Sequence, residues 1–242
     1  MLDVIPKVAL DSSEGQQLLT ESLIKQTVLI RLFNKQQKEV FCGLASAANV
    51  MSVQVLAHKY PDPSIHDQCD ITDVRYTEDN IFEHEETRSV IGSAQYVRYT
   101  EDNIFEHEET RSVIGSAQYV QQKNEGTSLK EIGDLLKMHG FVVVMKSGDE
   151  SDVDEFRQLA IEALSSTASG VILNFHHYSK VNWGHFSPLG AYHQKTDRFL
   201  IMDTRHDHPY VWVKVSDLYP LINTLDPFTN QSRGYLISKS NL

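Results

Sequence analysis

Cysteine is scarce in this chain, whose 242 residues include only two, Cys42 and Cys69. Two cysteines cannot form a framework of several disulfide bonds, so a hydrophobic core has to hold the fold together. Hydrophobic residues make up 40% of the sequence, which is sufficient for one domain with a substantial core. We interpret Cys69, in the segment IHDQCDI, as an incidental thiol, and this leaves Cys42 as the cysteine of interest.

Long apolar runs and an excess of basic residues are both absent. No stretch of 18 apolar residues occurs, so the sequence predicts no membrane-spanning helix. The net charge of −11 makes nucleic acid or an anionic membrane surface an unfavourable partner. The first ten residues lack a basic segment followed by an apolar stretch, so no signal peptide is predicted. We expect a cytoplasmic protein, or a periplasmic one if an export signal has been removed.

Motifs of known metal sites are also missing, because the sequence has neither an H-E-x-x-H segment nor paired C-x-x-C segments. We therefore expect no metal site in the protein itself. Short histidine-rich segments keep one alternative open, a non-enzymatic protein that binds or buffers metal ions. The candidate ligands are His206 and His208 in RHDHP, His176 and His177 in NFHHY, and His84 or His107 in two identical HEE segments.

Cys42 stands at the predicted start of a helix. Gly43 opens a run of apolar residues with helical spacing, namely Leu44, Ala47, Ala48, Met51 and Val55. The positive end of a helix dipole lowers the pKa of a thiol, and the thiolate is the nucleophilic form. Gln36 precedes Cys42 by six residues, a position from which a side-chain amide can help to bind an oxyanion.

His185 and Asp203 follow far downstream, and the order Gln, Cys, His, Asp is the one that papain-like geometry requires. His185 lies 143 residues after Cys42, within the roughly 130–150 residues of papain-type enzymes. A 23-residue repeat lengthens that interval, so the spacing is only permissive. A cysteine peptidase or a transglutaminase-like enzyme with the same residue order remains an alternative.

Three segments carry a more specific signal: FCGLAS at Phe41–Ser46, GHFSPLGAY at Gly184–Tyr192 and DRFLIMD at Asp197–Asp203. With these segments the chain resembles the phytochelatin synthases, specifically the short bacterial type that has only the catalytic domain. The resemblance implies that Cys42 is the nucleophile, His185 the general base and acid, and Asp203 the group that orients the imidazole. It places Gln36 at the oxyanion hole.

The resemblance also implies a reaction linked to heavy-metal detoxification, in which the cysteine attacks the Cys–Gly amide of glutathione, releases glycine and passes the γ-glutamyl-cysteinyl group to water or to a second glutathione. It implies a fold and a substrate site as well. The fold is α+β and papain-like, with a helical half that carries the nucleophile packed on an antiparallel sheet that carries His and Asp, and residues 1–242 form a single catalytic domain. The substrate is glutathione, whose γ-glutamyl head Asp226 and Arg233 would bind, since a guanidinium grips a carboxylate through two hydrogen bonds. No prosthetic group is expected; a heavy-metal ion such as cadmium would enter as a glutathione thiolate complex. A homodimer is a candidate state.

An exact repeat interrupts the pattern, because Val74–Tyr96 and Val97–Tyr119 are identical at all 23 positions. Repeat architectures diverge between copies and need about three units to form a continuous core. We therefore interpret one copy as an insertion at the surface. The sequence does not indicate which copy holds the native place.

Helical patterns precede strand patterns along most of the chain, as in α+β folds. The predicted helices are Ser12–Leu19, Thr20–Lys25, Gly43–His58, Ser128–Met138 with Thr127 as its cap, and Val153–Leu164 with Asp152 as its cap. The predicted strands are Phe141–Met145, Val171–Phe175, His185–Tyr192, Arg198–Asp203, Tyr210–Val213 and Tyr235–Ser238. This arrangement would place Cys42 opposite His185 and Asp203 across a cleft.

Overall fold

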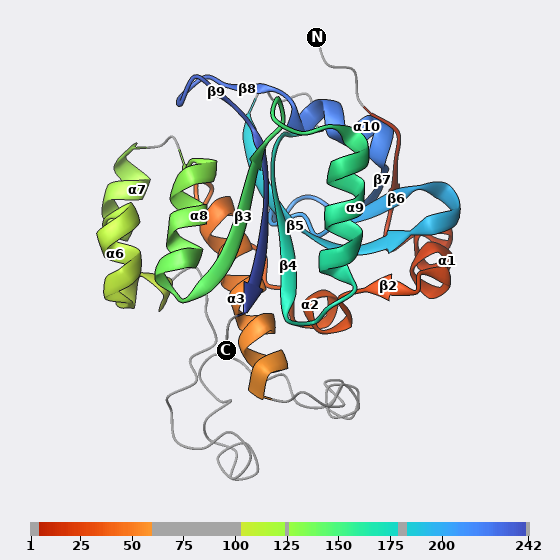
Figure 1. The fold of residues 1–242 in the computed structure, drawn as a ribbon, viewed down its shortest axis with the longest axis horizontal. Helices are drawn as coiled ribbons and strands as arrows, with labels where there is room; N and C mark the ends of the chain where they lie inside the picture. The colour runs from red at the N-terminus through yellow and green to blue at the C-terminus, as the bar shows by residue number, and fades with distance from the viewer. Residues whose placement is uncertain (1–4, 60–102, 124–125, 179–182, 241–242) are drawn as a thin grey trace.

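An antiparallel sheet occupies the centre of the computed structural model, which describes residues 5–59, 103–123, 126–178 and 183–240 (Figure 1). Its strand order is β1-β7-β6-β5-β4-β10-β3, and β2 also pairs with β5. The strands are β1 (Lys7–Ala9), β2 (Ile24–Lys25), β3 (Phe141–Ser147), β4 (Ser169–His176), β5 (Gly184–His193), β6 (Arg198–Ile201), β7 (Val211–Lys214) and β10 (Gly234–Ser240); β8 (Leu225–Asp226) and β9 (Gln231–Ser232) form a separate pair. 

Helices cover both faces of this sheet. They are α1 (Ser13–Glu21), α2 (Thr27–Leu32), α3 (Cys42–Lys59), α6 (Glu108–Ile114), α7 (Ala117–Lys123), α8 (Leu129–Met138), α9 (Val153–Leu164) and α10 (Val215–Ile222), with 3-10 turns η1 (Asn103–Glu106) and η2 (Gln194–Thr196). None of the helices in the described ranges has the length and apolar character needed to span a bilayer.

The alternation of side chains along β4 shows how the two faces are filled. Val171, Leu173 and Phe175 belong to one core cluster, which includes Phe156 of α9. Ile172 points the other way, into a second cluster that α3 and α8 complete. Successive residues of a strand face opposite sides, so a strand buried on both faces reads as a continuous apolar run. This sheet therefore positions helix α3 on one face and helix α9 on the other.

The helix caps show where sequence rules succeeded and where they were one residue off. Asp152 caps α9 as predicted, and its side chain accepts hydrogen bonds from the backbone N–H groups of Asp154 and Glu155. For α8 the predicted cap, Thr127, is wrong: Ser128 caps the helix in a reciprocal capping box with Glu131. A glutamate at the third helical position selects Ser128 because its carboxylate reaches back to that residue's backbone N–H.

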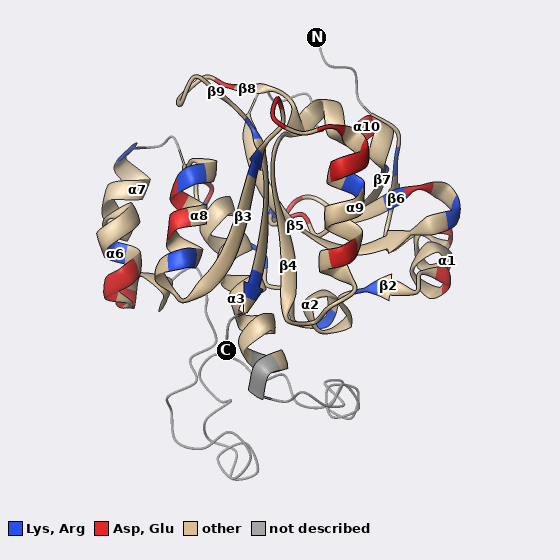
Figure 2. Ribbon diagram, in the orientation of Figure 1, with Lys and Arg blue, Asp and Glu red and all other residues tan. Residues whose placement is uncertain are grey.

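Acidic and basic residues are interspersed on the outer helices. Figure 2 shows both signs of charge on α6, α8 and α9. On α8, Asp134 lies 3.5 Å from Lys137 and also pairs with Lys130, at the i,i+3 and i,i+4 spacings that bring helix side chains together. The polar sides of these helices thus face solvent while their apolar sides pack on the sheet.

The described part of the second repeat copy packs into the core. Ile104 is fully buried, Ile114 is nearly so, and the ring of Phe105 lies 5.5 Å from that of Phe41, next to Cys42. Thr110 contributes a further contact, because its hydroxyl lies 2.9 Å from Nε2 of His139, the residue that ends α8. The second copy therefore occupies a fitted place beside α8. The first copy, Val74–Tyr96, and Cys69 lie outside the described residues.

Candidate active site

Cys42 is the first residue of α3, and its side chain is 9% exposed. The next residue has to be small, since a Cβ on Gly43 would lie only 2.2 Å from the hydroxyl of Thr127 and 3.0 Å from Ile132 of α8. Glycine at this position lets the first turn of α3 pack directly against α8. The close packing fixes the helix N-terminus, and with it the thiol.

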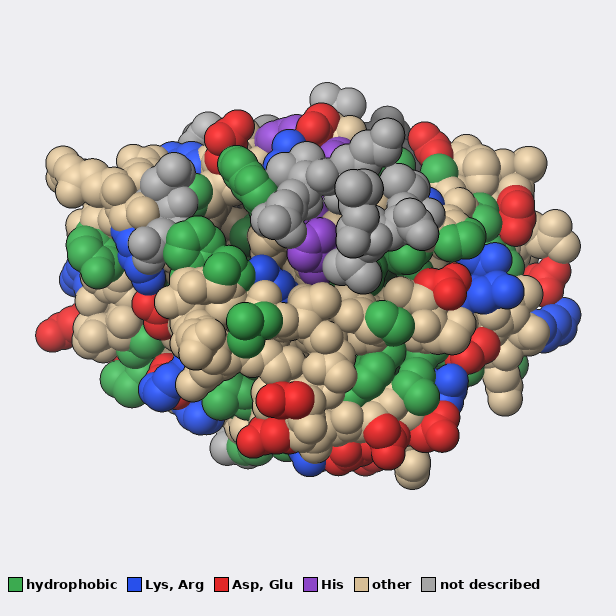
Figure 3. Space-filling view, turned by 90° about the horizontal axis from the view of Figure 1, so that it is seen from above, with side chains coloured by type: hydrophobic (Ala, Val, Ile, Leu, Met, Phe, Trp, Pro, Cys, Tyr) green, Lys and Arg blue, Asp and Glu red, His purple; other side chains and the backbone are tan. Residues whose placement is uncertain are grey.

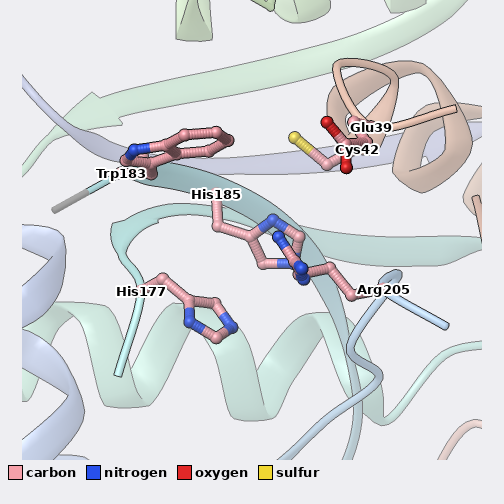
Figure 4. Close-up of a pocket in the computed structure, with 7 residues that line it drawn as sticks. Glu39, Cys42, His177, Trp183, His185 and Arg205 are labelled. Carbon is pink, nitrogen blue, oxygen red and sulfur yellow. The ribbon is translucent and has the colours of Figure 1, made fainter. Parts of the chain in front are cut away.

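His185 and Asp203 reach the same place from the sheet. His185 is the second residue of β5, and Asp203 follows β6, the strand that pairs with β5. Nε2 of His185 lies 2.9 Å from Oδ1 of Asp203, and both side chains are buried. Figure 4 shows Cys42 and His185 side by side in one pocket. Three of the residues singled out from the sequence thus come together, although 161 positions separate the first from the last.

The electrostatics of this group favour a thiolate–imidazolium pair. Burial raises the pKa of the Cys42 thiol, but the hydrogen bond and charge of His185, with backbone N–H groups of Phe186 and Gly43, lower it overall. Burial likewise lowers the pKa of His185, yet its bonds to Asp203 and Cys42 raise that pKa to about 9. The lowered pKa of the thiol favours the thiolate, the form that acts as a nucleophile.

Asp203 is the most densely bonded carboxylate in the site. Its Oδ1 also accepts the backbone N–H of Arg205 at 3.0 Å. Its Oδ2 accepts the hydroxyl of Tyr178 and lies 3.1 Å from Nε2 of His177 and 3.4 Å from Nδ1 of His208. Burial alone would raise the pKa of Asp203, but the hydrogen bonds from His177, His185 and His208 hold it well below its usual range. The carboxylate is therefore ionised and fixed in orientation.

Tyr178 and Thr204 were missed by sequence reasoning. Each is adjacent in sequence to a singled-out residue, His177 or Asp203, but carries no motif of its own. The hydroxyl of Thr204 donates to Oε1 of Gln36 at 2.8 Å and lies 3.3 Å from Nε2 of His185. Thr204 thus links the loop before Cys42 to the sheet.

Gln36 is buried beside this group, but its amide is engaged by its own loop. The Nε2 group donates to the carbonyl oxygens of Lys38 and Glu39, at 2.9 and 2.8 Å. These two bonds use both amide hydrogens and hold the loop that leads into α3. A role in an oxyanion hole stays a prediction, and it requires the amide to release one of these carbonyls.

The pocket next to the thiol is lined by Glu39, His177, Trp183, Gly184 and Arg205, together with Cys42 and His185. Figure 3 shows histidine side chains at the surface near the middle of the face seen from above. Trp183 is 58% exposed, which places a large aromatic surface at the pocket where a ligand can cover it.

Asp226 and Arg233 also lie together, both buried, with Nη1 of Arg233 3.4 Å from Oδ2 of Asp226. The guanidinium rests on the backbone of Gly184, where a Cβ would come within 2.2 Å of Nη1. Glycine immediately before His185 therefore admits the arginine to the edge of the pocket. Burial lowers the pKa of Arg233, while the charges of Asp226 and Cys42 act in the opposite direction.

A cysteine at a helix N-terminus, facing an imidazole that a buried carboxylate supports on an antiparallel sheet, is the arrangement of a cysteine-dependent enzyme, here on an α+β fold. The predicted α+β class is thus confirmed. The chain belongs to the phytochelatin synthase family, whose sequence model matches residues 88–235, well over half of its length.

Curated relatives agree with this assignment. Glutathione gamma-glutamylcysteinyltransferase 3 of Lotus japonicus is 25% identical over 96% of this chain, and glutathione gamma-glutamylcysteinyltransferase 1 of Arabidopsis thaliana is 24% identical over the same share. The chain spans about two fifths of the length of these relatives, 42% and 41%. Among solved structures, the peptidase domain of Streptococcus ComA aligns with 86% of this chain and 97% of its own, with a TM-score of 0.43 and 11% identity.

Proposed function

We propose that the protein cleaves the Cys–Gly amide of glutathione and transfers the γ-glutamyl-cysteinyl group to water or to a second glutathione. The observation that carries this proposal is the buried Cys42–His185–Asp203 arrangement in a chain of the phytochelatin synthase family. Transfer to water gives γ-glutamylcysteine, and transfer to the amine of glutathione gives the dimeric phytochelatin.

The reaction divides into two steps. The Cys42 thiolate attacks the carbonyl carbon of the Cys–Gly amide, and the resulting oxyanion is held by backbone N–H groups at the start of α3, with Gln36 as a further candidate donor. The His185 imidazolium gives its proton to the departing glycine amine, which leaves a thioester on Cys42. His185 then takes a proton from water or from the acceptor amine as that group attacks the thioester and frees the thiol.

The Asp226–Arg233 pair is the proposed site for the γ-glutamyl head. Nη1 of Arg233 faces Asp226 and the amide oxygen of Asn174, each at 3.4 Å, while its buried Nε has no hydrogen-bond partner among the described residues. A buried donor without a partner is costly, so a carboxylate that completes its hydrogen bonding is favoured. The glutamyl carboxylate would bind Arg233, and the adjacent ammonium would bind Asp226.

Heavy metal enters this proposal as part of the substrate. A cadmium ion that holds glutathione thiolates gives an acceptor whose thiols are blocked, which connects the reaction to metal detoxification. Blocking the thiol chemically, as in S-methylglutathione, is expected to make the transfer largely independent of cadmium.

Product analysis tests the proposal. The protein is incubated with glutathione, with and without cadmium, and the products are identified by mass. Equimolar glycine and γ-glutamylcysteine, or glycine and the dimeric phytochelatin, are the expected products. Cleavage of unrelated peptides with glutathione left intact would instead favour the cysteine peptidase or transglutaminase-like alternative. The same measurement with the Cys42→Ala variant separates enzymatic turnover from release by a contaminant.

A further inference from the structure

Three potential metal ligands converge behind the catalytic histidine. They are Nε2 of His177, which follows β4, and Oδ2 of Asp203 and Nδ1 of His208, which follow β6. The two imidazole nitrogens lie 3.0 Å apart, and they lie 3.1 Å and 3.4 Å from the carboxylate oxygen. The arrangement is thus a compact triangle of two imidazole nitrogens and one carboxylate oxygen.

This triangle has the size of one face of a metal coordination sphere. Zinc binds imidazole nitrogen and carboxylate oxygen at about 2.0–2.1 Å, so the ligands of a tetrahedral zinc ion lie about 3.3–3.4 Å from one another. The observed edges are within a few tenths of an ångström of that value. We propose that His177, Asp203 and His208 form a binding site for a divalent transition-metal ion of the zinc class, with the fourth position open to solvent.

The surroundings of the triangle match those of metal sites. Ligating carboxylates are themselves hydrogen-bonded, and Oδ2 of Asp203 accepts the hydroxyl of Tyr178 while Oδ1 faces His185. Ligating histidines direct their second ring nitrogen at an acceptor, and the carboxylate of Asp207 lies 3.8 Å from Nε2 of His208, just beyond hydrogen-bond distance. The proposed metal ion would therefore bind Oδ2 of Asp203, whereas His185 contacts Oδ1.

The loop that carries His208 is held in place, and an ion can reach it. Lys35 donates hydrogen bonds from its ammonium group to the backbone carbonyls of Arg205 and His208, the former at 2.9 Å, which fixes the loop without entering the triangle. The side chain of His208 is 20% exposed, and His177 lines the pocket beside Cys42. The triangle is thus preformed, with His177 and Asp203 buried, and an ion would reach it from the side of the partly exposed His208.

The ligand atoms also determine which metal ions the site prefers. Imidazole and carboxylate suit zinc, nickel and copper ions, whereas thiolate selects softer ions. The site is therefore separate from any cadmium carried on glutathione thiolates. An ion on Oδ2 would also draw on the negative charge that supports His185 through Oδ1, so its occupancy is expected to slow turnover.

Direct binding to a protein without thiols tests the site. In the Cys42→Ala, Cys69→Ala protein, which cannot turn over, calorimetric titration with zinc chloride is expected to show one equivalent of tight binding. Cobalt(II) should give the absorption of a four-coordinate ion. Because the protein is inactive, the result does not depend on the proposed function.

Two added substitutions make the test specific. His208→Ala removes one of three ligands and should weaken zinc binding by at least about 100-fold, since even outer contacts of a metal site are worth 10–100-fold. His206→Ala, an exposed histidine two residues away, is the matched control and should bind as the parent does. Thermal melting of both variants checks that they fold. Absence of stoichiometric binding in the parent, or equal binding in the folded His208→Ala variant, would overturn the proposal.

Discussion

The contact between Asp203 and His185 allows a prediction with a magnitude. The pKa of His185 rises from 6.5 to about 9, a change that corresponds to about 3 kcal/mol of support for the imidazolium. The hydrogen bond to Asp203 is the largest favourable contribution, ahead of that to Cys42. If Asp203→Asn removes about half of the support, the thiolate–imidazolium pair loses about 1–2 kcal/mol, or roughly 10-fold in population.

The sign of the pH dependence follows from the direction of this shift. Because the pKa of His185 is raised on folding, its contribution to stability is complete below pH 6.5, the unfolded value. That contribution is lost as the pH rises through about 9. The contribution of His185 to the stability of the wild-type protein should therefore decline across this interval. In Asp203→Asn this decline should be much smaller, because less of the contribution is present at low pH.

Alkylation of Cys42 by iodoacetamide is the assay, because the reagent reacts with the thiolate. Rates are measured from pH 4 to 10 by peptide mass, with EDTA present so that no metal ion occupies Asp203. The onset of reactivity should move up by about one pH unit in Asp203→Asn. Asp207→Asn, which removes an exposed carboxylate from the same loop, should follow the wild type. Superimposable profiles for Asp203→Asn and wild type would refute the assigned role of Asp203.

Three further predictions concern the nucleophile, the substrate head and the repeat. Cys42→Ala should abolish glycine release without loss of fold, and brief exposure of the wild type to glutathione should add the acyl mass at Cys42; labelling confined to Cys69 would contradict this. Arg233→Ala should raise the glutathione KM by about 10-fold or more with a smaller effect on kcat, since a charge-assisted hydrogen bond contributes about 1.5–3 kcal/mol; unchanged kinetics would place the γ-glutamyl head elsewhere. Deleting one repeat copy, which gives the same 219-residue polypeptide whichever copy is removed, should preserve melting temperature and activity; a melting point several degrees lower would mean that both copies are structurally used.

The elements that the sequence predicted best are those in which local and tertiary signals agree. Helix α9 begins after Asp152, where a cap residue precedes an apolar stripe, and α3 follows the spacing from Gly43 onward. Helix α10 was not predicted, because it contains Pro220 and a proline normally ends a helix. Strand β1 was missed as well, since three residues at Lys7–Ala9 acquire strand geometry only by pairing with β7.

Some features of the candidate site could likewise be predicted from the sequence, and others could not. Cys42, His185 and Asp203 were predictable because each lies in a distinctive segment. His177 and His208 were named as candidate ligands, but their convergence on Asp203 was not predictable, because they belong to two loops that only the pairing of β4, β5 and β6 brings together. Spacing rules detect ligands that share a loop or a helix, and they fail for ligands that a sheet assembles.

The duplicated segment gives the chain an unusual redundancy. Ile104, Phe105 and Ile114 fill the space beside Phe41 and α8, and the same three residue types recur 23 positions earlier as Ile81, Phe82 and Ile91. A substitution that spoils one copy leaves an intact sequence for the same packing face, tethered to the same domain.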